Sequence, residues 1–440
     1  MTANSSKLAG LISKTIPVGM GIACLFLSQA LMARFMGPDS FGSYSYFMTW
    51  ITVAALLAKA GHEWVLLKAV PAKIRLHRIG EIRFLVVRAI KAVSVRATLA
   101  AAILLALALV VGRAEGLDAQ VMIAGSLLVI VLALAEIRRS LALAYGAIWL
   151  AEAPENIIKS GILILVAASI ALTGSIAPKA MLWANLAITL FTSMGAAIIF
   201  VRWREKDILS LPSIKIETRS HDDLMRSMWI TNFLNIILKN ADILIIGMIT
   251  DFASTGIYIA ATRVAALAAA PVMVLDRIVA PPIAEAAELG DYERVRASSW
   301  EYSILSTAAC FILVLFMCVF GNHFISILFG DRYDGALLVT WILLIGHAAN
   351  ALTGPTGVLL SMSGAHRILV FIAIIGAALY LALLFVLAPK YLALGAASAF
   401  AVTHTAKALM QAYFVKRRLG INPTIFHLGT FALKPADRPS

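Results

Sequence analysis

The sequence predicts an all-α integral membrane protein with about twelve transmembrane helices in two parallel-repeat six-helix lobes around a central cavity. Composition is the first reason: 61% of the 440 residues are hydrophobic and 14% are charged, whereas soluble domains are roughly half apolar and a quarter charged. The second reason is that apolar runs long enough to cross a bilayer recur along the whole chain. The third is that short motifs of the first half return in the second half.

The first half of the chain predicts six spans separated by short connections. They cover residues 9–34, 42–60, 87–111, 119–135, 153–172 and 180–201. The turn Met36–Phe41 contains Gly37, Pro38 and Asp39, which are typical turn residues. The basic segment Lys68–Arg88 alternates cations with apolar residues, which indicates an interfacial helix on the cytoplasmic side.

The second half predicts six further spans. They cover residues 227–249, 255–274, 304–320, 336–361, 368–387 and 392–414. The longest connection predicted on the outer side is Gly321–Gly335. We therefore expect an N-terminal lobe (1–201), a cytoplasmic linker (202–226), a C-terminal lobe (227–415) and a cytoplasmic tail (416–440).

Three motif pairs indicate that the lobes arose by duplication. Gly42-Ser43-Tyr44 opens the second span as Gly256-Ile257-Tyr258 opens the eighth. Ala177-Pro178-Lys179 and Ala388-Pro389-Lys390 precede the sixth and twelfth spans, which end in Phe200-Val201-Arg202 and Phe414-Val415-Lys416. An even number of spans in each unit makes the repeats parallel, an arrangement found in transporters.

The distribution of charge sets the expected topology. The net charge is +13, and most Lys and Arg lie in alternate connections, which favours a cytoplasmic location for both termini and for the linker. The basic surface then faces membrane lipids, and we expect no nucleic-acid partner. The three cysteines lie within apolar runs, and no metal-ligand spacing is present, so we expect neither metal nor cofactor.

One hairpin of the second lobe concentrates charge where the membrane makes charge expensive. Lys239 and Asp242 lie on the seventh span, and Arg263 lies two turns into the eighth. Each ionised group costs at least about 2.5–3.5 kcal/mol at the bilayer centre. Asn232 and Asn235 share a helix face with Lys239 and Asp242. A structural ion pair for Asp242 and a role toward a charged cargo both remain open.

Two later spans also carry polar residues that are candidates for a lumen. They are His347 and Asn350 on the tenth span, and His404 and Lys407 on the twelfth. Gly354 and Pro355 break the tenth span and are a candidate hinge, because freed backbone groups are tolerated only against protein or water. Lys59 and Glu63 lie near the end of the second span, where snorkelling to the interface is the expected explanation.

Several stretches of the chain resemble the polysaccharide transporter family of lipid-linked oligosaccharide (O-antigen-type) flippases, in the multidrug/oligosaccharidyl-lipid/polysaccharide exporter superfamily. The stretches are ALMARFMGPDSFGSYSY (30–46), NADILIIGMITDFASTGIYIAATRVAAL (240–267), APPIAEAAELGD (280–291), ILFGDRYDGA (327–336) and LAPKYLALGAASAF (387–400). The likeness spans nearly the whole chain and keeps the family's order.

This resemblance implies alternating access in a bacterial inner membrane. The implied cargo is an anionic undecaprenyl-pyrophosphate-linked oligosaccharide, carried to the outer leaflet for O-antigen or exopolysaccharide synthesis. A cationic cavity would hold the phosphates, for which Lys239, Arg263 and Lys407 are the candidates. A polysaccharide polymerase and chain-length or export proteins are the expected partners, and a monomer is the expected oligomeric state.

A lipid II flippase, which would normally have two further helices, and two other classes of function remain as alternatives. A multidrug cation antiporter of the same superfamily would carry acidic residues in its first helices, but residues 9–34 contain no Asp or Glu. An integral-membrane polymerase or acyltransferase would need a large outer loop or a catalytic His/Asp pair. Neither feature is found, nor are the motifs of an ATPase, a zinc protease or a serine hydrolase, so we expect no enzyme.

Overall fold

The computed structural model describes residues 2–115, 119–173, 177–208, 239–288, 291–362 and 365–424, with the single residues 214, 225, 229 and 233. These residues form helices and connections, without a strand among them. The chain divides into two compact units, Met1–Asn240 and Ala241–Ser440. Each unit is described by itself.

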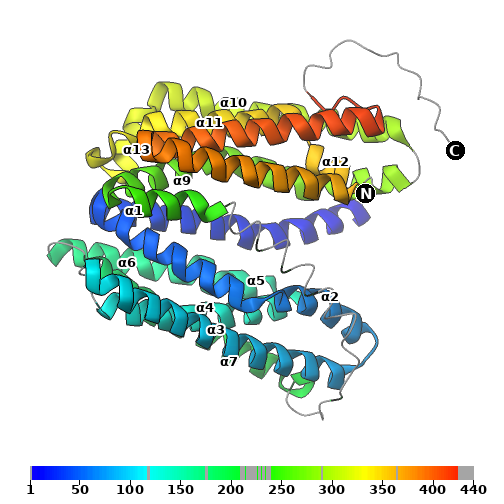
Figure 1. The fold of residues 1–440 in the computed structure, drawn as a ribbon. Helices are drawn as coiled ribbons and strands as arrows, with labels where there is room; N and C mark the ends of the chain where they lie inside the picture. The colour runs from blue at the N-terminus through cyan, green and yellow to red at the C-terminus, as the bar shows by residue number, and fades with distance from the viewer. Residues whose placement is uncertain are drawn as a thin grey trace. The chain divides into compact units, whose positions relative to one another are not determined.

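The first unit is a bundle built around α4 (Figure 1). Its elements are α1 (Thr2–Lys59), α2 (His62–Arg75), α3 (Ile79–Glu115), α4 (Ala119–Ala144), α5 (Ile148–Glu152), the π-helix η1 (Ala153–Ile158), α6 (Lys159–Thr173) and α7 (Pro178–Ile208). Helix α4 packs against α1, α2, α3 and α7. Its residues Ala124, Leu128 and Ala133 are fully buried, which makes α4 the core helix of this unit.

Helix α1 contains the first two predicted spans, joined at a break. Gly37 has φ 76° and ψ 168°, outside the helical region. A positive φ is readily adopted by glycine but strained for other residues. The turn expected at Met36–Phe41 is therefore present, reduced to a sharp break in an otherwise continuous helix.

The basic segment 68–88 is not one interfacial helix, which corrects the sequence-based expectation. Helix α2 ends at Arg75, and the amide of Arg78 donates to the carbonyl of Lys73 across a tight turn. Glu81, in the first turn of α3, forms ion pairs with Lys73 and Arg78. These opposite charges satisfy part of the basic cluster within the protein.

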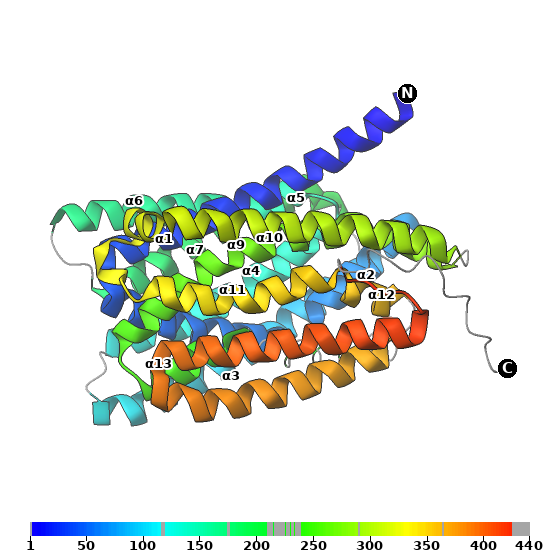
Figure 2. The same ribbon diagram turned by 90° about the horizontal axis from the view of Figure 1, so that it is seen from above.

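The second unit begins with a helix over residues 241–249 and continues with long helices that run side by side (Figure 2). Its further elements are α9 (Phe252–Glu288), α10 (Tyr292–Phe329), the 3-10 turn η2 (Asp331–Tyr333), α11 (Ala336–Thr353), α12 (Thr356–Met362) and α13 (His366–Leu419). Helix α11 packs against α9, α10 and α13. Because α10 reaches Phe329, the outer connection expected over 321–335 is shorter than predicted.

Two helices of this unit are interrupted near the predicted positions. Gly354, at φ 76°, separates α11 from α12, which confirms the break expected at Gly354-Pro355. Leu392, at φ 52° and ψ −130°, divides α13 between the two predicted spans 368–387 and 392–414. A Cβ on the nearby Gly395 would lie 2.2 Å from the carbonyl oxygen of Leu387, so this tight corner requires glycine.

Eight helices among the described residues are long and apolar enough to cross a membrane. Two of them, Gly19–Lys59 and Arg367–Leu419, are the broken helices that each carry two predicted spans. The chain is thus a multi-pass all-α integral membrane protein. The count of twelve, the lobe boundaries at 201 and 227 and the parallel repeat remain predictions.

Candidate functional site

Asp242 is held in the interior of the second unit by the hairpin that follows it. Its side chain accepts a hydrogen bond of 2.6 Å from the Tyr258 hydroxyl and one of 2.8 Å from the Ile243 amide. Asp242 is 7% exposed and Tyr258 is fully buried. Tyr258 lies at the start of α9, so the short turn at residues 250–251 is what brings the two residues together.

Arg263 lies on α9 but does not pair with Asp242. No ion pair within 4.0 Å joins them in the described part of the chain, and the Arg263 Nε is buried without a hydrogen-bond partner. Asp242 thus takes its direct hydrogen bond from Tyr258, while Arg263 interacts with it only through charge. A guanidinium whose Nε has no partner in a protein interior is a candidate for binding an anion.

The two candidate histidines stand together around one aromatic ring. His404 stacks on Phe400 at 3.9 Å between ring centroids, and His347 lies 6.4 Å from His404. Lys407 follows one turn later on α13, and its stem packs on Gly376, where a Cβ would lie 2.6 Å from the Lys407 Cδ. These polar residues thus bring α11 together with both parts of α13, the part before and the part after the break at Leu392.

Lys239, the remaining candidate cation, is exposed and lines a cavity of about 500 Å³ within the first unit. The other charged residues of the cavity wall are Lys59 of α1, Glu63 of α2, and Glu136 and Arg139 of α4. Three cations and two anions therefore surround one space that admits solvent. Asn232 and Asn235, expected on the same face as Lys239, lie outside the described residues.

The cavity wall continues into a chain of ion pairs. Lys59 Nζ lies 3.5 Å from Glu63 and 3.3 Å from Glu136. Arg139 lies 3.5 Å from Glu136 and donates to both carboxylate oxygens of Glu152 at 2.8 and 3.0 Å. Lys59 and Glu63 are 4% and 8% exposed, so the expected snorkelling is wrong for both. Their charges are compensated by each other and by α4.

Sequence reasoning missed the contribution of α4 and α5 to this site. Glu136, Arg138 and Arg139 interrupt an otherwise apolar helix, and Glu152 and Glu155 follow shortly. Arg138 donates to the Leu150 carbonyl at 2.8 Å and lies 3.4 Å from Glu155. This local excess of opposite charges was the available signal. The π-helix that carries Glu155 is of a kind frequent at functional sites.

A smaller polar cavity of about 270 Å³ lies within the second unit at the break between α11 and α12. Asn350, Gly354 and Pro355, all predicted as lumen or hinge residues, line it together with Asp276. Burial raises the pKa of Asp276 above its ordinary value, and the hydrogen bond from Tyr302 opposes this rise. The candidate hinge is therefore adjacent to a carboxylate that the sequence analysis did not single out.

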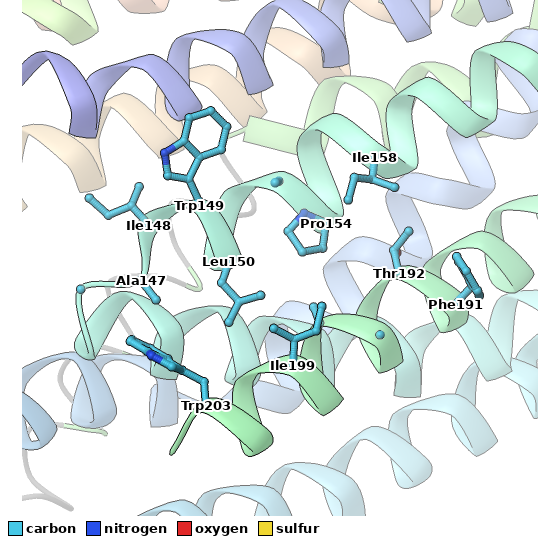
Figure 3. A pocket seen from close by; sticks show the side chains of 14 residues that line it. Ala147, Ile148, Trp149, Leu150, Pro154, Ile158, Phe191, Thr192, Ile199 and Trp203 are labelled. Carbon is cyan, nitrogen blue, oxygen red and sulfur yellow. The ribbon is translucent and has the colours of Figure 1, made fainter. Parts of the chain in front are cut away.

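A further cavity, of about 750 Å³ between α5–η1 and α7, is apolar (Figure 3). Trp149, Leu150, Pro154 and Ile199 line it, and its one hydroxyl, on Thr192, already donates to the Ile188 carbonyl. It offers no chemistry for a charged ligand. Among the residues that the structure describes, no cluster of His, Cys, Asp and Glu could hold a metal ion.

A protein family described as "Polysaccharide biosynthesis protein" matches residues 31–338, more than half of the chain. A comparison with curated proteins finds no match.

Solved structures of multidrug transporters share the fold across almost the whole chain. The inward-facing form of a multidrug resistance MATE family transporter of the MOP superfamily has a TM-score of 0.72 at 11% identity, covering 92% of this chain and 98% of that one. A substituted MATE transporter from Vibrio cholerae has 0.64 at 14% identity, covering 95% and 99%. An outward-facing MATE transporter has 0.58 at 13% identity, covering 93% and 95%.

Proposed function

The chain belongs to the polysaccharide biosynthesis protein family, and from this membership we propose that it is a flippase. Its cargo is an undecaprenyl-pyrophosphate-linked oligosaccharide, which it carries by alternating access from the cytoplasmic to the outer leaflet of the inner membrane. The product serves surface polysaccharide or O-antigen synthesis. A polymerase and chain-length or export proteins act on it next.

The observation that carries this proposal is the charged cavity of the first unit. Lys59, Arg139 and Lys239 supply three cations to its described wall; Glu63, Glu136 and Glu152 pair with the first two of them, and Lys239 has no ion pair among the described residues. A pyrophosphate cannot cross hydrocarbon unaided, because isolated charge is strongly excluded from it. Cations at a hydrated cavity within the membrane can hold the phosphates by charge-assisted hydrogen bonds.

The carboxylates of this wall have a role in release. Lys59 lies between Glu63 and Glu136 at 3.5 and 3.3 Å, and Arg139 contacts Glu136 and Glu152. A phosphate that binds these cations competes with the carboxylates for the same donors. The headgroup is therefore held weakly enough to leave, while Lys239, which has no ion pair among the described residues, attracts it first.

Arg263 and Lys407 are the corresponding candidates in the second unit. Arg263 has an unpartnered Nε, and its planar guanidinium can bind a phosphate through two parallel bonds. Lys407 lies one turn from the His404–Phe400 stack, and an aromatic face beside a polar residue suits a sugar ring. Each unit thus offers its own cations to the headgroup.

The multidrug antiporter is the second candidate, since the similar solved structures are multidrug transporters. Identities of 11–14% establish a shared fold and leave the cargo open. Lys239 is the one cation of this wall without an ion pair among the described residues, so an organic cation that enters the cavity meets an uncompensated positive charge. The charge of the cavity therefore favours the anionic cargo.

The deciding experiment follows the lipid-linked oligosaccharide in a strain that lacks this protein. We expect the lipid-linked unit to be made and to accumulate, while surface polysaccharide disappears. Complementation with Lys239→Ala should restore little polysaccharide, whereas the matched control Lys179→Ala, an exposed lysine outside the cavity, should restore it fully. A null strain that makes no lipid-linked unit would indicate an enzyme, and unchanged polysaccharide with raised drug sensitivity would indicate the antiporter.

A further inference from the structure

The polar cavity at the break between α11 and α12 has a lining unlike that of the charged cavity. Its side chains come from α9, α10, α11, α12 and α13 of the second unit, and none of its lining residues is Lys, Arg or His. The polar lining residues are Asp276, Tyr302, Asn350, Thr356, Ser361 and Gln411. Among the described lining residues, the Asp276 carboxylate is therefore the only formal charge.

Several oxygen atoms of this wall remain available to a ligand. The Tyr302 hydroxyl donates to Asp276 Oδ1 at 2.6 Å, which leaves the second carboxylate oxygen without a described partner. The Thr356 hydroxyl donates to Gln411 Oε1 at 2.9 Å, so its own lone pairs face no donor among the described residues. The Asn350 side chain has no hydrogen-bond partner in the part of the chain that the structure describes.

The backbone around the cavity adds negative potential. Helix α11 ends at Thr353, and the last carbonyls of a helix carry partial negative charge. The Asn350 carbonyl accepts a hydrogen bond from the Thr353 hydroxyl, and the Ala351 carbonyl accepts from the Ser306 and Thr307 hydroxyls and the Gly354 amide. None of these donors carries a formal charge. Interrupted helices whose C-terminal ends point at a cavity are a recurrent way to bind monovalent cations in membrane proteins.

We propose that this cavity binds a sodium-sized monovalent cation, with Asp276 as the charged ligand and the side-chain oxygens of Asn350, Thr356 and Gln411 as neutral ligands. Hard cations take oxygen ligands, and the charge of the ligand set governs which ion is held. A single carboxylate matches a single positive charge. A pyrophosphate or a carboxylate ligand is repelled by the same wall, so this site is distinct from the one proposed for the cargo headgroup.

A bound cation joins the two sides of the break. Asp276 comes from α9, Asn350 from α11, Thr356 from α12 and Gln411 from α13. Coordination by all four helices fixes α12 relative to α11, so the cation stabilises one conformation of the break at Gly354-Pro355. Loss of the cation leaves that break held by packing and by the Thr356–Gln411 hydrogen bond.

The test is thermal unfolding of the purified full-length protein in detergent, with NaCl replaced stepwise by choline chloride at constant ionic strength. We expect the unfolding temperature to rise with sodium and to saturate, and to stay constant when choline alone is varied. Asp276→Asn should remove the sodium dependence, while the control Asp251→Asn, an exposed carboxylate outside the cavity, should keep it. Equal shifts with sodium and choline, or a retained sodium shift in Asp276→Asn, would overturn the proposal.

A second variant keeps the test decisive if Asp276→Asn fails to fold. Gln411→Leu leaves the carboxylate in place but removes a neutral ligand, and we expect the half-saturating sodium concentration to rise about tenfold. An unchanged half-saturating concentration would also overturn the site. The measurement needs no cargo, so its outcome is independent of whether the protein flips a lipid-linked oligosaccharide.

Discussion

At the scale of single residues, the contrast between Asp242 and Arg263 is the most informative feature of the second unit. Both were expected to be charged neighbours within the membrane, and charge neutralisation was the simplest reason for keeping them. Asp242 is satisfied instead by the Tyr258 hydroxyl and the Ile243 amide, and Arg263 keeps a buried Nε without a partner. Arg263 and Asp242 therefore interact through their charges without a direct ion pair, and the unpartnered Nε remains able to bind an anion.

Arg263→Ala is predicted to abolish polysaccharide export while the protein stays at normal membrane levels. The double variant Arg263→Ala/Asp242→Ala should be equally inactive. Arg263→Lys should keep part of the activity, because lysine retains the positive charge but cannot bind a phosphate through two parallel hydrogen bonds. Export is measured per amount of protein in the membrane.

The double variant also provides the outcome that would refute this role. Removal of one member of a buried ion pair costs about 3–5 kcal/mol, whereas removal of both is mild. Export that returns to near the wild-type level in the double variant would therefore show that the two residues act as a structural pair.

At the scale of the elements, the start of α9 depends on a single capping residue. Asp251 accepts a hydrogen bond of 2.9 Å from the Ser254 amide, and the Thr255 hydroxyl donates to the Asp251 carbonyl at 3.1 Å. The Ser254 side chain and its backbone amide lower the pKa of Asp251 below its ordinary value. This cap fixes the hairpin that places Tyr258 against Asp242.

Asp251→Ala is predicted to lower the free energy of unfolding by about 1 kcal/mol near neutral pH, through loss of the cap. A carboxylate with a lowered pKa stabilises the fold above its unfolded-state pKa of about 3.9, and this stabilisation is lost as the pH falls through the folded-state value. Thermal unfolding at pH 7 and below pH 4 should show the difference between wild type and Asp251→Ala shrinking at acid pH. Asp251→Asn, which caps without titrating, should show no such change relative to Asp251→Ala.

The sequence predicted the helices well because their signals are local. Apolar runs gave the spans, Gly37 gave the break in α1, and Gly354-Pro355 gave the break between α11 and α12. The snorkelling predicted for Lys59 is wrong because its partner Glu136 lies 77 residues away in the sequence. The packing of α1 on α4 brings Lys59 Nζ to 3.3 Å from the Glu136 carboxylate.

The same limit applies to the cavity around Asp276. Its ligands come from four helices, and no spacing along the chain signals that they converge. His347 and His404 were each expected at a lumen, and the structure shows that they lie 6.4 Å apart between ring centroids, a proximity that no local pattern signals. Local patterns therefore identified polar faces, while the partners on those faces required the tertiary structure.

At the scale of the whole molecule, the asymmetry of basic residues predicts that the ends of the chain lie in the cytoplasm. After replacement of Cys24, Cys310 and Cys318, a single cysteine at Arg332 should react with a membrane-impermeant maleimide added to intact cells. One at Arg417, which is also exposed, should react only after the membrane is permeabilised. The reverse pattern would invert the topology and the proposed direction of transport.

The packing of the residues after α13 has a consequence for the order in which the second unit is completed. The Ser303 hydroxyl donates to the Pro423 carbonyl at 2.8 Å, and a Cβ on Gly354 would lie within 2.4 Å of both groups. Pro423 follows every span in the chain, so the ribosome makes it after all the helices that it stabilises. The break between α11 and α12 therefore acquires its last contact only after the final span has been synthesised. Translation that stops between Leu419 and Pro423 would produce every predicted span but leave Ser303 and Gly354 without their contact to Pro423.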